Sequence, residues 1–177
     1  KMPGSTSLLA EPLGPSLGIQ AQLPILLAEY PFRTQQDIAD YLHLLQDLPR
    51  YFSDLIALEQ EKSRQGVFQN DLAVDGIIRQ CSAFLADADT PESHLLHTVF
   101  QNKLQASSLF SEAERNLCLQ THEKLLTSCV FPAYRSLSDA LSSLRGKGTQ
   151  NAGGLSRQEG GLSYYAYLLR SRVGVDA

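Results

Sequence analysis

The sequence predicts an all-α fold, an irregular multi-helix bundle of about six helices. Apolar residues recur every three or four positions along most of the chain, which is the spacing of one buried helical face. Helix start signals stand directly before several of these stretches. With 177 residues, 43% of them hydrophobic and 19% charged, the composition is that of a globular chain with its own core. No stretch alternates convincingly between apolar and polar residues, so a sheet is not expected.

The N-terminal part is predicted to pass from an extended lead-in into helices. Residues 1–33 are rich in Pro, Gly and Ser and hold only a short apolar block, residues 23–30, which is expected to be buried. Thr34 and the aspartate three residues later form a capping-box pattern that opens the first long helix. Pro49 is predicted to close that helix and to open a second one, which ends near Gly66.

The remaining core helices follow from their own start signals. A third helix is predicted over residues 71–85, and Thr90 followed by Pro and Glu opens a fourth that runs to about residue 104. Ser111 with a glutamate three residues later is a full capping box, and it begins the longest apolar pattern. That pattern passes through Pro132, where a kink is expected. These helices make residues 34–145 the predicted helical core.

The C-terminal part is predicted to be a loop followed by one helix. Residues 146–161 are rich in glycine and break the apolar period, so they are interpreted as a flexible connector. Residues 162–177 form the predicted C-terminal helix. The four segments are expected to make a single domain. Lys1 before Met2 is unusual for a natural start, so the chain is also expected to be a piece of a larger protein.

Charge and cysteine usage exclude several classes of protein. The net charge of −4 is too acidic for a default nucleic-acid binder, and the local charge clusters are interpreted as solvated helix faces. No apolar run is long enough to span a membrane, and the N-terminus lacks the pattern of a secretory signal. Cys81, Cys118 and Cys129 lie in apolar helical patterns and are interpreted as free thiols, which predicts a cytoplasmic setting.

Two pairs of residues are candidate chemical sites. His94 and His97 lie three apart on a predicted helix and could face one side, as metal ligands do. No HExxH glutamate accompanies them, so surface or half-buried histidines are favoured. Cys118 and His122 lie four apart and could form a nucleophile and base, but no orienting group is apparent. The sequence therefore predicts neither a catalytic residue nor a metal ligand in this chain.

The C-terminal helix carries the one predicted binding site. Tyr164 and Tyr165 stand close to Arg170, and phenol hydroxyls with a guanidinium can hold a carboxylate. These three residues are the candidate substrate-binding set, although a core helix with a polar edge is the favoured alternative. The glycines of residues 146–161 match neither GxxxxGK[ST] nor GxGxxG after a strand, so no phosphate loop is predicted.

Four segments resemble a known bacterial family, domain-of-unknown-function family 885. The segments are GIQAQLPILLAEYPFRT at 18–34, DIADYLHLLQDLPRYFSDLIALEQEKSRQGVF at 37–68, CVFPAYRSLSDALSSLRG at 129–146 and GGLSRQEGGLSYYAYLLRSRVG at 153–174. The resemblance implies a long, almost wholly helical parent that is a zinc metallopeptidase-like hydrolase. In the family, the HExxH-type metal motif lies downstream of such segments. This chain contains no HExxH, so no metal ligand or catalytic glutamate is carried over.

The resemblance implies a role inside a larger enzyme. We expect a non-catalytic helical segment that forms part of the scaffold and of the substrate-cleft wall, inactive by itself. Its partners would be the remainder of the parent chain, which supplies the zinc, and a peptide substrate. A homodimer through exposed apolar surface is a further expectation, with neither nucleic acid nor membrane as a partner. The alternative is a free-standing helical protein-interaction module, which the absence of a catalytic set suits equally well.

Overall fold

The structure is a computed structural model that describes residues 8–148 and 158–174, and in these residues it contains helices and no strand. The all-α prediction is therefore confirmed. The α-helices are α1 (Ile19–Glu29), α2 (Gln35–Arg64), α3 (Asp71–Phe84), α4 (Leu95–Ala106), α5 (Glu112–Leu125), α6 (Phe131–Ser143) and α7 (Gly161–Leu168). A 3₁₀ turn (Pro91–Ser93) precedes α4, and π-helical segments follow α5 (Leu126–Val130) and α7 (Leu169–Val173).

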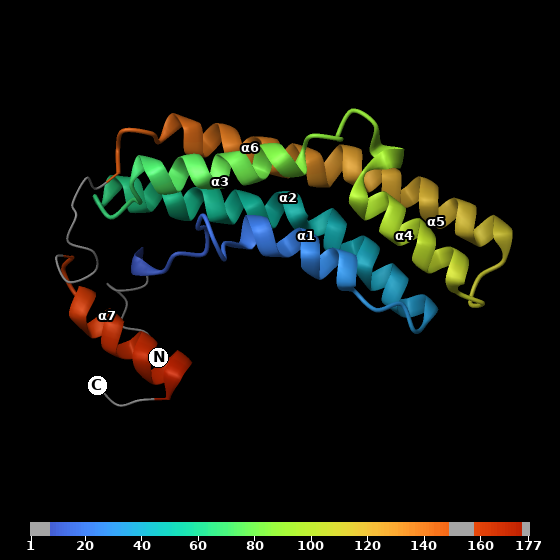
Figure 1. The fold of residues 1–177 in the computed structure, drawn as a ribbon, viewed down its shortest axis with the longest axis horizontal. Coiled ribbons are helices and arrows are strands. Elements are labelled where there is room, and N and C mark those ends of the chain that lie inside the picture. Colours follow the sequence, from blue (N-terminus) through green and yellow to red (C-terminus); the bar gives the residue numbers. More distant parts are fainter. Residues whose placement is uncertain (1–7, 149–157, 175–177) are drawn as a thin grey trace.

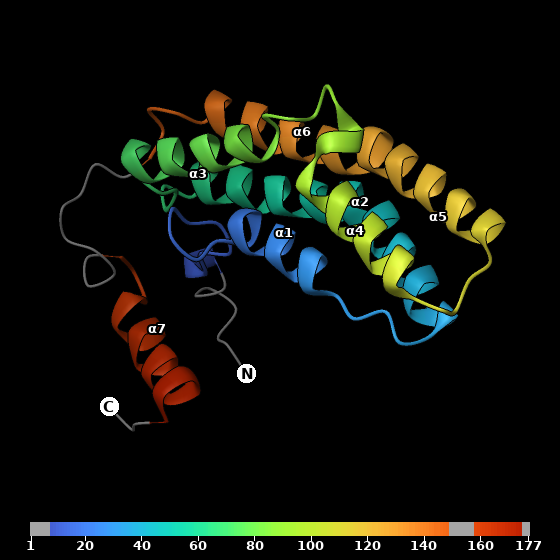
Figure 2. The ribbon, with the colours of Figure 1, turned by 45° about the vertical axis from the view of Figure 1, so that its right-hand side comes forward.

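The helices form an elongated bundle (Figure 1). At one end α6 packs against α2 and α3, and at the other end α4 packs against α5. Helix α1 lies along the side of the bundle, where it contacts α3 and α4. Figure 2 shows α7 standing apart from these helices, on the side of the bundle where the N-terminal segment lies.

The core is built from one face of α2 and one face of α6. The buried residues of α2 recur at helical spacing: Ile38, Tyr41, Leu45, Leu48, Phe52 and Leu55. From α6, the Tyr134 ring lies 4.8 Å from the Phe52 ring and 4.2 Å from the Phe84 ring of α3, measured between centroids. These aromatic contacts join the three helices because each ring buries a large apolar area.

The capping boxes are formed as predicted. Thr34 accepts a hydrogen bond from the backbone N–H of Asp37, whose side chain in turn accepts from the Thr34 N–H. Ser111 and Glu114 make the same reciprocal pair at the start of α5. The α2 helix ends just before Gly66, which has a φ of +72°, a conformation that glycine adopts without strain. These local signals therefore fixed where the two helices begin and where α2 ends.

Pro49 does not separate two helices, so this part of the prediction is wrong. Helix α2 continues through Pro49 for its full 30 residues. A proline inside a helix costs about 3 kcal/mol, because it removes one hydrogen bond and crowds the preceding turn. The apolar face stays in register on both sides of it: Leu45 and Leu48 before it and Phe52 and Leu55 after it are all buried. Burial of this continuous face offsets the local cost.

The lead-in is also more helical than predicted. Helix α1 begins at Ile19, inside the part of residues 1–33 that was expected to be extended. Pro24 lies within α1 and has no N–H to donate to the carbonyl of Gln20 one turn earlier. That buried carbonyl instead accepts a hydrogen bond of 3.0 Å from the Tyr134 hydroxyl of α6. A side chain 114 residues away in sequence thus replaces the missing backbone donor.

We expect Tyr134→Phe to lower the free energy of unfolding by about 1–3 kcal/mol, because it leaves the Gln20 carbonyl buried without a donor. Urea unfolding measures the loss. The matched background is Pro24→Ala, which restores a backbone N–H one turn after Gln20. In that background Tyr134→Phe should cost clearly less, and an equal cost in both backgrounds would contradict the compensation.

The two irregular segments in the middle of the chain differ in detail from the predictions. Thr90 and Pro91 open only a 3₁₀ turn, and α4 itself begins after His94, which serves as its N-cap. The long stretch from α5 to α6 is continuous, and its irregular part is the π-helical segment Leu126–Val130 just before Pro132. Proline cannot donate to the preceding turn, so a departure from α geometry near it is expected.

Candidate functional site

The three predicted substrate-binding residues do not lie together on one open surface. Tyr164 is buried, and its ring centroid lies 6.2 Å from that of Tyr167 one turn further along α7. Burial raises the pKa of the Tyr164 phenol. Tyr165 and Arg170 are exposed. Because Tyr164 is buried, only Tyr165 and Arg170 expose their side chains to solvent, and their contact with a substrate stays a prediction.

The histidines of α4 are buried, contrary to the favoured surface or half-buried placement. His94 caps α4: the Leu96 N–H donates to His94 Nδ1 over 3.3 Å, and His94 Nε2 donates to the Phe84 carbonyl over 3.0 Å. Both ring nitrogens of His94 are therefore used in the fold. His97 is also buried, and its ring faces His122 of α5. Within the described part of the chain, no group of three or more His, Cys, Asp or Glu side chains is arranged to hold a metal ion.

His122 belongs to a buried aromatic cluster that joins α2, α4 and α5. Its ring stacks on Phe100 with 4.2 Å between centroids, and its Nε2 atom lies 3.2 Å from the Tyr41 hydroxyl. The His97 ring lies 5.7 Å from it, and the Nδ1 atoms of both histidines are buried without a hydrogen-bond partner in the protein. Burial lowers the pKa of His122 to about 3, helped by the charges of His97 and His94. His122 is therefore neutral at ordinary pH.

The suggested nucleophile Cys118 is half-buried on α5. Burial raises the pKa of its thiol, with a smaller contribution from the Glu114 carboxylate. The thiol therefore stays protonated, which makes it a poor nucleophile. Cys118, Cys81 and Cys129 are all free cysteines, as the sequence predicted.

Only part of the glycine-rich segment, residues 146–161, belongs to the residues that the structure describes. Gly146 lies shortly after the end of α6 with a φ of +76°, and Gly160 stands just before α7 with a φ of +72°. The Gly146 N–H donates to Asp71 of α3 over 2.8 Å. Residues 149–157, which include Gly153, Gly154 and Arg157, lie outside the described residues.

Sequence reasoning missed an ion pair inside the bundle. Glu59 and Lys62 of α2 are each only 1% exposed, with 3.4 Å between Glu59 Oε1 and Lys62 Nζ. Lys62 Nζ also donates to the Ala10 carbonyl over 3.2 Å, which fixes the segment that precedes α1. Burial raises the pKa of the Glu59 carboxyl, and the Lys62 charge opposes this shift. The sequence did carry a signal, because Glu59 continues the apolar spacing of Phe52 and Leu55.

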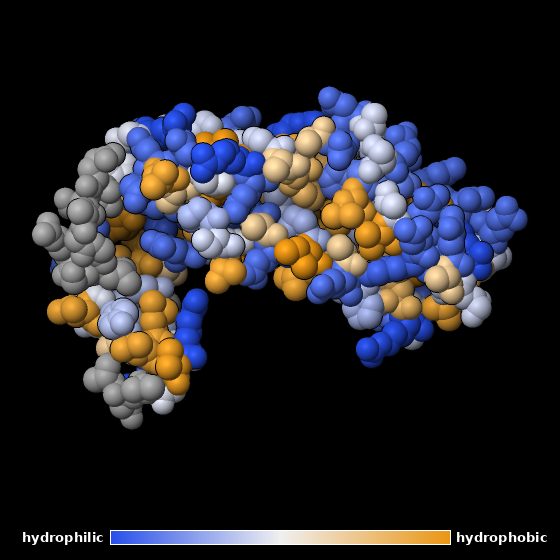
Figure 3. All heavy atoms as spheres, in the orientation of Figure 1, coloured by the Kyte–Doolittle hydropathy of each residue, from blue (hydrophilic) through white to orange (hydrophobic). Residues whose placement is uncertain are grey.

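A second missed feature is an open apolar groove between α1 and α2. It encloses about 400 Å³. Gln22 and Asp47 are the two polar residues of its lining, and the others are apolar. The full lining is Ile19, Gln22, Leu23, Leu26, Leu27, Leu44, Asp47, Leu48 and Tyr51. Figure 3 shows apolar side chains gathered along the edge of the bundle formed by α1. Sequence reasoning expected residues 23–30 to be buried, but Ile25 is 57% and Leu26 60% exposed, so that prediction is wrong for this part of α1.

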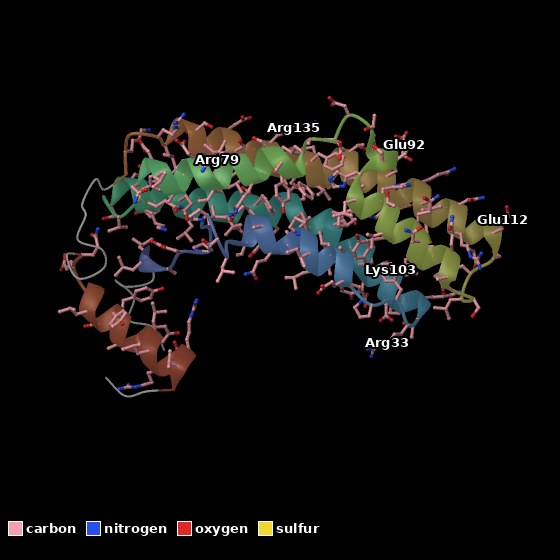
Figure 4. All side chains as sticks on the ribbon, viewed as in Figure 1. Arg33, Arg79, Glu92, Lys103, Glu112 and Arg135 are labelled. Atoms are coloured by element: carbon pink, nitrogen blue, oxygen red, sulfur yellow. The ribbon has the colours of Figure 1, made fainter. Side chains whose placement is uncertain are left out.

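Helix α1 is held firmly beside this groove. Lys103 of α4 points toward the end of α1 (Figure 4), where its Nζ donates to the carbonyls of Ala28 and Tyr30. A lysine at a helix C-terminus satisfies free carbonyls and complements the helix dipole. The Lys103 Nζ atom also lies 5.2 Å from the Phe32 ring centroid. With Tyr134 bonded to Gln20 near the other end, both ends of α1 are fixed.

These features define an all-α bundle with an open apolar groove between α1 and α2. The family model of bacterial proteins of unknown function, DUF885, matches residues 6–177. The chain therefore belongs to that family, which confirms the resemblance of its sequence segments. No curated protein matches the chain.

A solved structure shares the fold. It is described as "the putative lipoprotein from Colwellia psychrerythraea", and it superposes with a TM-score of 0.81 at 17% sequence identity. The match covers 94% of this chain and 28% of that protein, so the chain spans little more than a quarter of the length of this relative. In the described residues no helix is long and apolar enough to cross a membrane. The cytoplasmic location expected from the cysteines stays a prediction.

Proposed function

We propose that this chain is a non-catalytic helical segment of a longer protein, in which it builds part of the scaffold and of the substrate-cleft wall. The observation that carries the proposal is the coverage of the solved relative. Nearly the whole chain superposes on that protein, yet it accounts for only 28% of it. Most residues of a protein of that length lie outside the part that this chain matches.

The parent would be a zinc metallopeptidase-like hydrolase, as the family resemblance implies. Bound zinc in such enzymes polarises a carbonyl and activates a water molecule. The described residues of this chain do not fit a zinc site, because His94 uses both ring nitrogens in the fold and no group of three ligands converges. We therefore assign the zinc to the remainder of the parent. The contribution of this chain to peptide binding would come from Tyr165 and Arg170, beside the buried Tyr164.

A free-standing interaction module is the second candidate. The open α1–α2 groove favours it, because soluble monomers seldom leave a contiguous apolar surface uncovered. In that case the groove would receive a separate protein or a second copy of the chain. The two candidates differ in whether the partner belongs to the same polypeptide chain or to a separate molecule.

The gene sequence and the metal content of the full gene product test the proposal. We expect the open reading frame to continue past Ala177 into an HExxH segment. The full product, purified without chelators, should hold stoichiometric zinc by elemental analysis. Its His→Ala variant in that motif is the matched control and should lose the zinc. A stop codon directly after Ala177 would contradict the proposal and favour the interaction module.

A further inference from the structure

The α1–α2 groove has the geometry of a helix-binding site. On α1, Ile19, Leu23 and Leu26 line it at positions i, i+4 and i+7. On α2, Leu44, Leu48 and Tyr51 line it at the same spacing. Each row follows one face of its helix for two turns, which is about 10 Å. Two such rows on either side of a groove provide the ridges between which the side chains of a third helix insert.

The exposure of these rows distinguishes them from ordinary surface leucines. Leu26, Leu44 and Tyr51 are all exposed large hydrophobic residues, and they meet at one groove. Leu72 on α3 is 79% exposed but does not line this groove. Single exposed leucines are common, whereas a contiguous apolar groove marks an interaction surface.

The chemistry of the lining specifies the occupant. The lining is mostly apolar, so the bound helix needs apolar side chains at i, i+3/i+4 and i+7. Asp47 is the one charged residue of the lining, and Gln22 is its one neutral polar residue. An arginine or lysine on the bound helix, next to its apolar stripe, would pair with the Asp47 carboxylate at the rim.

We propose that the α1–α2 groove binds an amphipathic helix from the part of the parent protein outside this chain. This inference rests on the proposed function, because it needs a longer parent. The solved relative, of which this chain matches 28%, has ample further length to supply such a helix. The firm attachment of both ends of α1 keeps the groove preformed, which lowers the cost of binding.

Thiol labelling in the full gene product tests this directly. Leu26→Cys and Leu72→Cys are made separately in a background in which Cys81, Cys118 and Cys129 are replaced by serine or alanine. Both side chains are exposed in this chain. In the native parent we expect the thiol at position 26 to react with a maleimide at least about tenfold more slowly than the thiol at position 72, relative to their rates in urea. Protection of this size corresponds to burial in a stable contact.

A cross-linking step identifies what covers the groove. A short bifunctional reagent attached to the thiol at position 26 should capture a segment of the parent beyond this chain, with apolar residues at i, i+3/i+4 and i+7. Equal labelling rates at positions 26 and 72 in a parent longer than this chain would overturn the inference alone. A gene product that ends at Ala177 would overturn the proposed function as well. Capture of a second copy of this chain would overturn the inference and assign the groove to a dimer.

Discussion

Replacing Lys62 by methionine is expected to lower the free energy of unfolding by about 3–5 kcal/mol at pH 7, because it leaves the Glu59 carboxylate buried without its counter-charge. The Oε2 atom of Glu59 already lacks a hydrogen-bond partner. The ion pair with Lys62 is therefore the main interaction that offsets the cost of burying this carboxylate. The substitution also removes the donor to the Ala10 carbonyl. Urea unfolding of the variant and of the unsubstituted chain at pH 7 measures the difference.

The pH dependence of this loss follows from the direction of the Glu59 shift. A carboxyl whose pKa is raised by folding holds more protons folded than unfolded, so stability falls as the pH rises through that window. Burial already raises the pKa of Glu59 above its ordinary 4.5, and Lys62 opposes the shift. Without Lys62 the pKa rises further. The difference in unfolding free energy between Lys62→Met and the unsubstituted chain should therefore shrink as the pH falls from 7 toward 4.5.

A double variant is the control for this prediction. Glu59→Gln combined with Lys62→Met removes both charges and keeps similar volume, so it should recover most of the stability lost in the single variant. Arg64→Met on the same helix, where the pair with Glu61 is exposed, is the matched surface control and should cost no more than about 1 kcal/mol. A loss at position 62 no larger than at position 64 would show that the buried pair is not the cause.

Local sequence signals predicted the helix starts because the atoms that form a cap lie within four residues of one another. Thr34 with Asp37, and Ser111 with Glu114, needed no knowledge of the rest of the fold. Helix α1 was missed for the opposite reason. Pro24 is accommodated by the Tyr134 hydroxyl, which comes from another helix far along the chain. A rule that considers only neighbours in sequence cannot contain that hydrogen bond.

The candidate site was harder to predict than the fold. The apolar block at residues 23–30 was expected to be buried as a whole, because the sequence alone cannot say which of its side chains another helix covers. In this chain Leu27 is buried while Leu26 is exposed in the groove. In the same way, the spacing of Glu59 placed it on the buried face of α2, but only the structure shows that Lys62 lies beside it in the interior. Both features depend on which helices meet in space.

The second large effect is expected from His122 in acid. Its pKa is lowered from 6.5 to about 3 by burial, with smaller contributions from the charges of His97 and His94. Between these two values the unfolded chain binds a proton that the folded chain does not. Stability from this residue is therefore fully present above pH 6.5 and is lost as the pH falls toward 3. At pH 5 the loss amounts to about 2 kcal/mol.

His122→Phe isolates this contribution, because a phenyl ring can keep the stacking between Phe100 and Tyr41 while it cannot take up a proton. It leaves the Tyr41 hydroxyl without its partner, so Tyr41→Phe is combined with it to avoid a buried unpaired group. Between pH 7 and pH 5, the unfolding free energy of this double variant should fall about 2 kcal/mol less than that of the unsubstituted chain. His43→Gln, on an exposed part of α2, controls for the loss of an imidazole. If the double variant loses as much stability as the unsubstituted chain over this range, His122 is not the group whose protonation destabilises the fold in acid.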